Sequence, residues 1–208
     1  MRILIVDDHE IVFSGIKLII QNAGEKYTLF NCYDGNECIE LVTKQDFDLL
    51  IVDVNLPDTD TLQLVQLLKI RNPKLKILIF SMSPVEMYAK RFLKLGVFGY
   101  LSKQSTSEEF LSAVRSILNG KKYISDEVGQ LLVDDVIEGK NNDVFSKLTD
   151  RELEVLRLFL KGFTGKEIAK MTNLHTSTIG SHKAKIYQKL NVKNLLELKE
   201  LARLNNFE

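Results

Sequence analysis

The first half of the chain alternates short apolar runs, rich in branched side chains, with longer stretches in which apolar residues recur every three or four positions. The short runs predict strands, and the longer stretches predict amphipathic helices. The expected strands are Arg2–Val6, Tyr27–Asn31, Asp48–Asp53, Leu75–Phe80 and Val97–Leu101. Because a helical stretch separates each strand from the next, the pattern predicts a parallel sheet with helices on both faces.

Side chains that can cap a helix precede three of these helical stretches. Each offers an oxygen acceptor that is followed three residues later by a carboxylate, which is the pattern of a helix start. The three pairs are Asp34 with Glu37, Ser83 with Glu86 and Thr106 with Glu109. We expect a helix to begin directly after each acceptor, with Pro84 in the first turn of the second helix.

The pattern changes after Gly120, where the chain becomes acidic and then polar before a new series of helical stretches begins. We therefore divide the chain into a first domain at 1–122, a partly helical and acidic linker at 123–147, and a second domain at 148–208.

The second domain predicts helices alone. Two further start patterns and two further helices are present: Thr149 with Glu152, Thr164 with Glu167, Thr176–Leu190 and Leu195–Leu204. Closely spaced short helices are the usual context of a helix-turn-helix. The fold class expected for the whole chain is therefore an α/β domain followed by a small all-α domain.

Charge is balanced over the whole chain but not along it. The 28 Lys and Arg residues match 28 Asp and Glu residues. Residues 126–145 hold one basic side chain against six acidic ones, and residues 146–208 hold 12 basic against 7 acidic ones. A small basic domain in a neutral chain is suited to a polyanion such as nucleic acid, although a lysine-rich solvated surface produces the same count.

The sequence also predicts the compartment. No apolar run approaches the roughly 20 residues that a membrane span needs. The first ten residues, MRILIVDDHE, lack the order of charged and apolar regions that a secretory signal has. Cys32 and Cys38 have neither metal-ligand nor disulfide spacing. We expect a cytoplasmic protein with no membrane partner.

Polar side chains follow the carboxyl ends of four predicted strands. They are Asp7, Asp8, Asp53, Ser81 and Lys103. In a parallel sheet these ends meet at one edge, where ligands bind. Crowded carboxylates repel one another unless a hard cation joins them, which predicts a Mg²⁺ site. A lysine can offset one phosphoryl charge and a serine can donate to a phosphoryl oxygen, which leaves Asp53 free to attack phosphorus.

The segments VDDHE, IVDVNLPDTD, IFSMS and GYLSK, spread over about the first 120 residues, resemble the receiver domain of two-component response regulators. The resemblance implies a flavodoxin-like fold with a five-stranded sheet in the order 2-1-3-4-5. It implies that Asp53 is the phosphoacceptor and also faces the Mg²⁺ ion. Asp8 would be a direct ligand of that ion, Asp7 a water-mediated ligand, and Asn55 a ligand through its backbone carbonyl.

The same resemblance implies a phosphoryl-sensing pair, Ser81 and Lys103, and a switch aromatic, Tyr100. The alternative for Tyr100 is an ordinary tyrosine that only packs in the core. Two positions depart from the family. Thr61 stands where the family usually has Gly, which predicts an altered backbone after Asp53. Met82 is bulkier than the small residue usual after the switch hydroxyl, and our hypothesis is that it shields the phosphoryl group from hydrolysis.

The stretch from Leu148 to Val192 resembles the helix-turn-helix of the LuxR type in NarL/FixJ response regulators. At 3.6 residues per turn, one face of the expected helix at 176–190 is small and polar, as a helix in the major groove requires. The predicted DNA contacts are Ser177, Thr178, Gly180, Ser181, Lys183, Ala184, Lys185 and Gln188. Gly180 departs from the basic residue that the family commonly has there, and His175 replaces the usual Ser cap.

These resemblances predict a transcription regulator that is controlled by phosphorylation. A sensor histidine kinase would phosphorylate Asp53, and the second domain would bind double-stranded promoter DNA as a homodimer. The protein would be no enzyme beyond promoting its own phosphorylation and dephosphorylation. Two alternatives stay open: a regulator that binds DNA whatever its phosphorylation state, and a phosphotransfer enzyme with Asp53 as its nucleophile.

Overall fold

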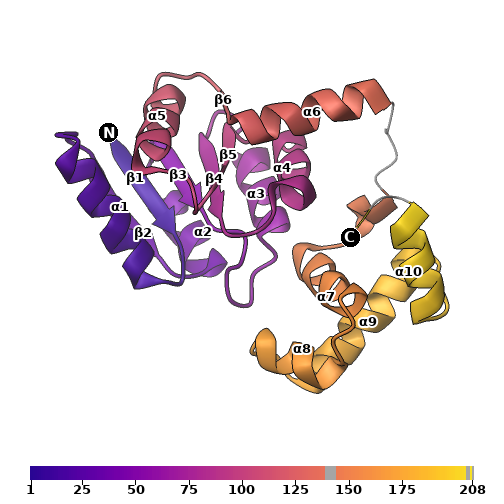
Figure 1. The fold of residues 1–208 in the computed structure, drawn as a ribbon. Coiled ribbons are helices and arrows are strands. Elements are labelled where there is room, and N and C mark those ends of the chain that lie inside the picture. The colour runs from indigo at the N-terminus through magenta and orange to yellow at the C-terminus, as the bar shows by residue number, and fades with distance from the viewer. Residues whose placement is uncertain (139–143, 205–206, 208) are drawn as a thin grey trace. The chain divides into compact units, whose positions relative to one another are not determined.

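The computed structural model describes residues 1–138, 144–204 and 207, which belong to two compact units (Figure 1). The first unit ends at Glu138 and the second begins at Gly139. The part of the predicted linker from 139 to 143 lies outside the described residues. Within the described ranges, no helix combines the length and the apolar character that crossing a membrane requires.

The first unit is built on a parallel sheet. Its strands are β1 (Arg2–Val6), β2 (Thr28–Cys32), β3 (Leu49–Val52), β4 (Ile77–Ser81), β5 (Gly99–Ser102) and β6 (Tyr123–Ile124). Their order is β2-β1-β3-β4-β5-β6, and every pair of neighbours is parallel. The α/β fold and the order of the first five strands are confirmed, but the predicted number of strands was wrong. The sixth strand has only two residues, too few to show any alternation of polar and apolar positions.

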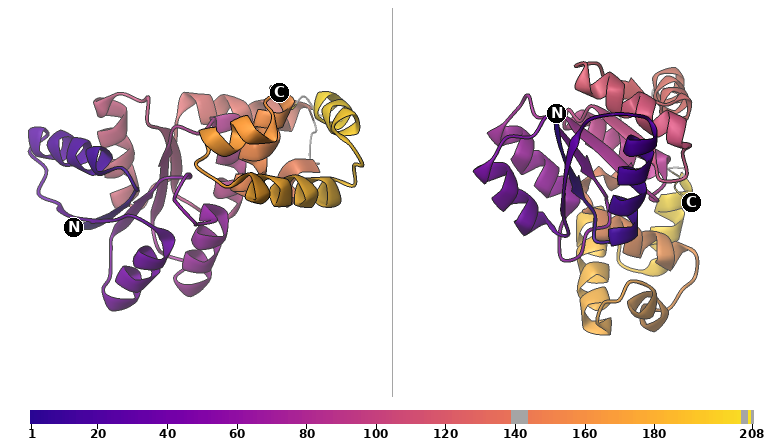
Figure 2. Two further views of the ribbon diagram at one scale, coloured as in Figure 1. Left: turned by 90° about the horizontal axis from the view of Figure 1, so that it is seen from below. Right: turned by 90° about the vertical axis from the view of Figure 1, so that its left-hand side faces the viewer.

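Helices cover both faces of this sheet (Figure 2). On one face lie α1 (Glu10–Asn22) and α5 (Ser107–Leu118), and on the other lie α2 (Gly35–Lys44), α3 (Thr61–Arg71) and α4 (Val85–Lys94). Successive side chains of a strand point to opposite faces of the sheet, and helices cover both faces. Consecutive residues of the central strands are therefore buried. Ile3 and Ile5 pack with α1 and α5 in one cluster. The two apolar layers hold the carboxyl ends of the strands in a fixed arrangement.

The predicted helix starts were right at two of three positions. The Asp34 side chain accepts hydrogen bonds from the backbone N–H groups of Asn36 and Glu37, and Thr106 forms a capping box with Glu109. The prediction at Ser83 was wrong, because α4 begins after Pro84 without a side-chain cap. The Ser83 hydroxyl instead accepts a hydrogen bond from the Asn55 side chain, at 3.0 Å.

A further helix, α6 (Asp126–Glu138), belongs to the first unit. It packs against α4, and its Val128 side chain is fully buried. The segment expected to begin the linker is therefore part of the compact body. The predicted linker boundaries at 123 and 147 stay a prediction.

The second unit consists of short helices, as predicted. They are η1 (Val144–Lys147), α7 (Asp150–Leu160), α8 (Gly165–Met171), α9 (Thr176–Leu190) and α10 (Leu195–Leu204). Capping boxes at Thr149 and Thr164 begin α7 and α8. His175 precedes α9 but makes no side-chain cap, and Asn191 ends this helix in the left-handed conformation. The helices at 176–190 and 195–204 have the bounds that the sequence predicted.

The apolar stripe of α9 packs inside this unit. Ile179 and Ile186 are buried against neighbouring helices, of which α7 and α8 make the most extensive contacts with α9. In α10, Leu198 and Ala202 are buried, whereas Leu196 is 77% exposed. Most of the apolar face of α10 therefore packs against other helices of the second unit. The packing leaves the opposite face of α9 open to solvent.

Candidate functional site

Three predicted pocket residues are joined by ion pairs at the carboxyl edge of the sheet. The backbone N–H of Asp7 donates to the carbonyl of Cys32, and that of Asp53 donates to the carbonyl of Val6, so both residues continue the strand pairing. The Nζ atom of Lys103, which follows β5, lies 2.6 Å from Asp7 Oδ2 and 3.1 Å from Asp53 Oδ2. The sheet therefore brings Asp7, Asp53 and Lys103 together as the sequence predicted.

The Asp53 carboxylate is buried, with 4% of the residue exposed. Its Oδ1 atom accepts a hydrogen bond from the backbone N–H of Val54 at 2.8 Å. Its Oδ2 atom faces the Lys103 ammonium. One oxygen is thus held by the backbone and the other by a cation, which gives this carboxylate a defined orientation.

Asp7 and Asp8 form a cluster with His9. Ligand atoms of the three residues lie within 4.8 Å of one another. The Nδ1 atom of His9 lies 2.8 Å from Asp8 Oδ1 and 3.3 Å from Asp7 Oδ1. Carboxylate oxygens are the ligands that Mg²⁺ prefers, so the chemistry of this donor set fits a hard divalent cation. His9 was not among the predicted site residues, and the structure places it beside both aspartates.

Ser83 connects three of the predicted residues. Its backbone N–H donates to Ser81 Oγ at 3.2 Å, and its carbonyl accepts the Tyr100 hydroxyl at 2.8 Å. Its hydroxyl accepts the bond from Asn55. Ser81 and Tyr100 are both fully buried. The loop after β4 therefore links Asn55 and Ser81 to Tyr100, the predicted switch tyrosine. These contacts of Ser83 were not predicted, because the residue also has the spacing of a helix cap.

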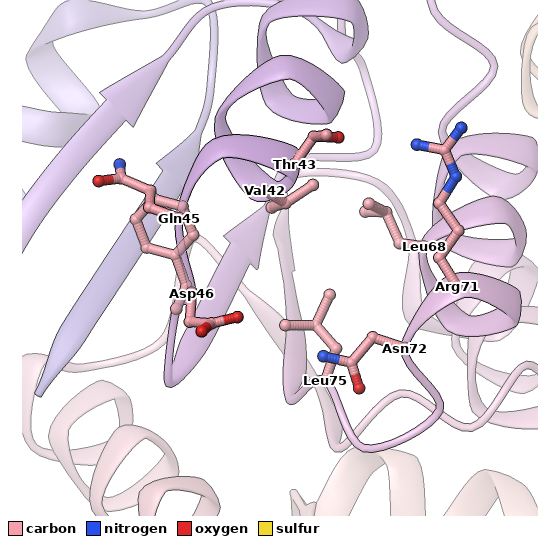
Figure 3. Close-up of a pocket in the computed structure, with 9 residues that line it drawn as sticks. Val42, Thr43, Gln45, Asp46, Leu68, Arg71, Asn72 and Leu75 are labelled. Carbon is pink, nitrogen blue, oxygen red and sulfur yellow. The ribbon is translucent and has the colours of Figure 1, made fainter.

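A pocket of about 560 Å³ lies at the amino ends of the strands, away from the carboxyl ends where Asp53 lies (Figure 3). It is lined by Val42, Thr43, Gln45, Asp46, Phe47, Leu68, Arg71, Asn72 and Leu75. These residues lie near the amino ends of β3 and β4, whereas Asp53 follows the carboxyl end of β3. Ligand sites in parallel sheets form at the carboxyl ends of the strands, so this pocket lies apart from the predicted site.

The exposed face of α9 contains most of the predicted DNA contacts. Six of them are exposed: Ser177, Gly180, Ser181, Ala184, Lys185 and Gln188. Thr178 and Lys183 are half-buried. The Lys183 Nζ atom lies 5.3 Å from the ring centroid of Phe159 and 5.5 Å from that of Tyr187, so it is held against aromatic faces. The DNA contacts of all eight residues stay a prediction.

An ion pair fixes α9 to α7. Glu152 is 2% exposed, and its Oε2 atom lies 2.6 Å from the Lys189 ammonium. Burial raises the pKa of Glu152, but the bonds from Lys189 and from the Thr149 backbone outweigh it and hold the pKa below its ordinary value. On α9, burial lowers the pKa of His182, whose Nδ1 atom is buried without a hydrogen-bond partner.

We expect acid to destabilise the second unit in two steps. A lowered His182 pKa means that the unfolded chain takes up the proton first, so stability is lost as the pH falls below about 6.5. A lowered Glu152 pKa means a further loss as the pH falls below about 4.5. Amide hydrogen exchange of α7 and α9 in the full chain measures both steps. The variant His182→Gln should lack the first step, whereas His175→Gln, at an exposed site, should retain it; a first step unchanged in His182→Gln would contradict this assignment.

Two family matches cover the two units. Residues 3–115 match the family described as "Response regulator receiver domain", and residues 146–202 match the family described as "Bacterial regulatory proteins, luxR family". The segment between these matches includes β6 and α6. The first match spans more than half of the chain. Fold and pocket thus define a signalling protein that joins a receiver domain to a regulatory helical domain.

Individual relatives support the same assignment over the whole chain. The oxygen regulatory protein NreC of Staphylococcus carnosus is 35% identical, with 97% of this chain and 96% of the relative covered. A solved structure of RcsB from Salmonella enterica serovar Typhimurium, bound to a promoter in the presence of the phosphomimetic BeF₃⁻, is 30% identical with a TM-score of 0.61, and 96% of each chain is covered. The chain belongs to the two-component response regulators of the NarL/FixJ type, which carry a LuxR-type helix-turn-helix.

Proposed function

We propose that this protein is a transcription regulator whose binding to promoter DNA is controlled by phosphorylation of Asp53. The observation that carries the proposal is the Lys103 ammonium, which lies between the buried carboxylates of Asp7 and Asp53. An acidic pocket with one fixed cation is suited to a phosphoryl group, because the cation offsets part of the added charge. The exposed polar face of α9 supports the DNA-binding half of the proposal.

In the proposed reaction, a sensor histidine kinase donates the phosphoryl group from a phosphohistidine. An Asp53 oxygen forms a bond to phosphorus while the P–N bond breaks, and the electron pair of that bond returns to the imidazole, which takes up a proton. Lys103 stabilises the charge on the phosphoryl oxygens, and the Ser81 hydroxyl donates to one of them. The product is an acyl phosphate on Asp53.

A Mg²⁺ ion would be held by Asp7, Asp8, Asp53 and the backbone carbonyl of Asn55. The close carboxylates of Asp7 and Asp8 support this choice. When bound, the ion neutralises the repulsion between these carboxylates and the incoming phosphoryl group. The chain's own contribution is to keep Asp53 oriented, through the Val54 N–H and Lys103.

The signal would leave the pocket through the loop after β4. A phosphoryl group that binds the Ser81 hydroxyl pulls on a residue already bonded to Ser83. Ser83 in turn accepts the Tyr100 hydroxyl. A shift of this loop therefore changes the hydrogen bond of Tyr100 and the start of α4, which follows Pro84.

The second unit would read DNA as a homodimer, with α9 in the major groove. The solved structures of RcsB, including one of two RcsB dimers bound to two parallel DNAs, support this part of the proposal. The predicted contacts on α9 would meet base edges and phosphates. A regulator that acts on bacterial promoters works in the cytoplasm, which is the location that we propose. No catalytic turnover of an external substrate is proposed.

Gly180→Ala should separate stability from DNA binding. A Cβ atom added at Gly180 meets no heavy atom within 4 Å, so the substitution should stabilise α9 by about 0.5–1 kcal/mol. If the backbone of α9 approaches DNA closely at this position, the added methyl group should weaken DNA binding. Chemical denaturation and DNA titration measure the two effects. Tighter DNA binding by the variant would refute the close approach.

Met82→Ala should shorten the lifetime of the phosphoryl group. Met82 follows the switch serine and is 58% exposed, so its side chain is available to cover the phosphoryl group. Loss of that cover should give water better access to phosphorus and speed hydrolysis severalfold. The decay of ³²P label after removal of the donor measures the lifetime. An unchanged lifetime would dispose of the shielding hypothesis.

A DNA-binding titration with and without a phosphoryl donor and Mg²⁺ tests the proposed function. Acetyl phosphate serves as the donor. DNA fragments that are selected from a random pool for binding to the protein serve as the ligand. We expect the donor to tighten binding about fivefold or more, since coupling energies between sites are about 1–3 kcal/mol. Equal affinity in both conditions would favour the alternative in which DNA binding ignores phosphorylation.

A further inference from the structure

The turn after Asp53 contains a buried hydrogen bond that the sequence did not predict. Thr61 is fully buried, and its hydroxyl donates to the backbone carbonyl of Val54 at 2.8 Å. Thr61 stands where the family usually has glycine. The position does not adopt a positive φ, since the described non-glycine residues that do so are Asp58, Asn173 and Asn191. The predicted change of backbone after Asp53 thus takes the form of a new side-chain bond.

The start of α3 leaves the Thr61 hydroxyl free for this bond. Asp60 caps the helix, because its side chain accepts the backbone N–H of Gln63 at 3.1 Å. Thr61 is the first helical residue and has no capping task of its own. Its hydroxyl therefore bonds the residue that directly follows the phosphoacceptor.

Val54 is held on both sides. Its N–H donates to Asp53 Oδ1 at 2.8 Å, and its carbonyl accepts the Thr61 hydroxyl. Val54 is 2% exposed, so water has little access to replace either bond. Together the two bonds restrict rotation of the peptide groups on either side of Val54. One of these groups orients the Asp53 carboxylate, and the other leads to Asn55, whose carbonyl we propose as a ligand of Mg²⁺.

We propose that Thr61 is a positioning residue for phosphorylation, which acts by fixing the turn that carries the Asp53 carboxylate. The inference rests on the proposed function of Asp53. Without the hydroxyl, the Val54 carbonyl is buried and unpaired, and the turn is free to rotate away from the orientation that attack on phosphorus requires. The effect is on the chemical step and not on binding of the phosphoryl donor.

The test measures phosphorylation of the full chain by acetyl phosphate with Mg²⁺ in excess. In Thr61→Val, which keeps the shape but lacks the hydroxyl, the rate constant at saturating donor should fall about tenfold. The donor concentration that gives half the maximal rate should change by less than about twofold. Thr61→Ser, which keeps the hydroxyl, should recover most of the rate.

Thr59→Val is the matched control. Thr59 lies in the same turn, and its hydroxyl donates to the Pro57 carbonyl at 2.9 Å and accepts the Gly35 N–H at 3.1 Å. Its bonds involve neither Val54 nor Asp53. If only rigidity of the turn matters, both valine variants should slow phosphorylation equally. If Thr61 acts through Val54, Thr59→Val should stay within about twofold of the unmodified protein.

Three outcomes would overturn the assignment: a normal rate in Thr61→Val, an equal loss in Thr59→Val, or no recovery in Thr61→Ser. Should Thr61→Val fail to fold, by circular dichroism, Thr61→Cys takes its place, because a thiol is a weak donor of similar size; a normal rate in that variant overturns the assignment too. Failure of the proposed function would look different. The unmodified protein would then take up no label, or Asp53→Asn would be labelled as well.

Discussion

Replacing Asp53 by alanine is expected to abolish labelling by a phosphoryl donor and to remove the effect of that donor on DNA binding. Asp53 provides the oxygen that would form the bond to phosphorus, whereas we assign the neighbouring carboxylates of Asp7 and Asp8 to the Mg²⁺ ion. DNA affinity of the variant should equal that of the unphosphorylated protein. Uptake of ³²P from acetyl phosphate and a DNA titration with and without donor measure both effects.

Asp46→Asn is the control for this variant. Asp46 is an exposed aspartate at the opposite edge of the sheet, where it lines the pocket of Figure 3. Its replacement removes one negative charge but should leave labelling and the DNA response intact. A full DNA response in Asp53→Ala would remove phosphorylation of this residue from the mechanism.

Lys103→Met is expected to have the second largest effect, on stability. The Lys103 side chain is 11% exposed, and its ammonium contacts two carboxylates that are almost fully buried. Without this cation, Asp7 and Asp53 lose the ammonium that both of them contact. Removing one partner of a buried ion pair is strongly destabilising because the other charge stays buried. The free energy of unfolding should therefore fall by about 3 kcal/mol in the absence of divalent ions. Mg²⁺ should recover part of the loss, since binding to the folded state stabilises it.

Urea denaturation with and without Mg²⁺ measures this effect, and Lys44→Met is the matched control. Lys44 pairs with Glu40 on the surface of α2, where the side chains are 66% and 62% exposed. Such a pair contributes at most about 1 kcal/mol, and Mg²⁺ should make no difference to it. A Lys103→Met protein as stable as the unmodified one, in the absence of Mg²⁺, would contradict the assigned role of the ammonium.

The ends of the strands were the most predictable part of the site. Asp7, Asp53, Ser81 and Lys103 each lie at the end of a short apolar run, and parallel strands carry such positions to one edge. Lys103 contacts Asp7 and Asp53 for this reason. The pairing required no knowledge of side-chain packing, only the order of strands along the chain.

Side-chain partners between loops were not predictable in the same way. Ser83 has the spacing of a helix cap, yet its hydroxyl accepts Asn55 from another loop. The choice between the two partners depends on how β4 and α4 join in space, which local sequence does not determine. The same holds for Thr61, whose hydroxyl bonds to Val54 in another part of the turn while Asp60 caps α3.

The helical unit followed local rules closely, because its helix starts are capping boxes with short-range partners. Its long-range features were less accessible. The contacts of the Lys183 ammonium with the rings of Phe159 and Tyr187 were not predicted, and its contact with DNA stays a prediction. The ion pair between Glu152 and Lys189 joins residues far apart in the chain, and no short sequence motif predicts it.

The most direct test of the account is to locate the phosphoryl group. Reduction with borohydride converts a phosphorylated aspartate into homoserine, which peptide mass spectrometry places at a single position. After treatment with acetyl phosphate and Mg²⁺, we predict conversion at Asp53 alone, to an extent that rises in step with DNA affinity. Conversion at Asp7 or Asp8 instead, or a full DNA response with no conversion at Asp53, would contradict the account.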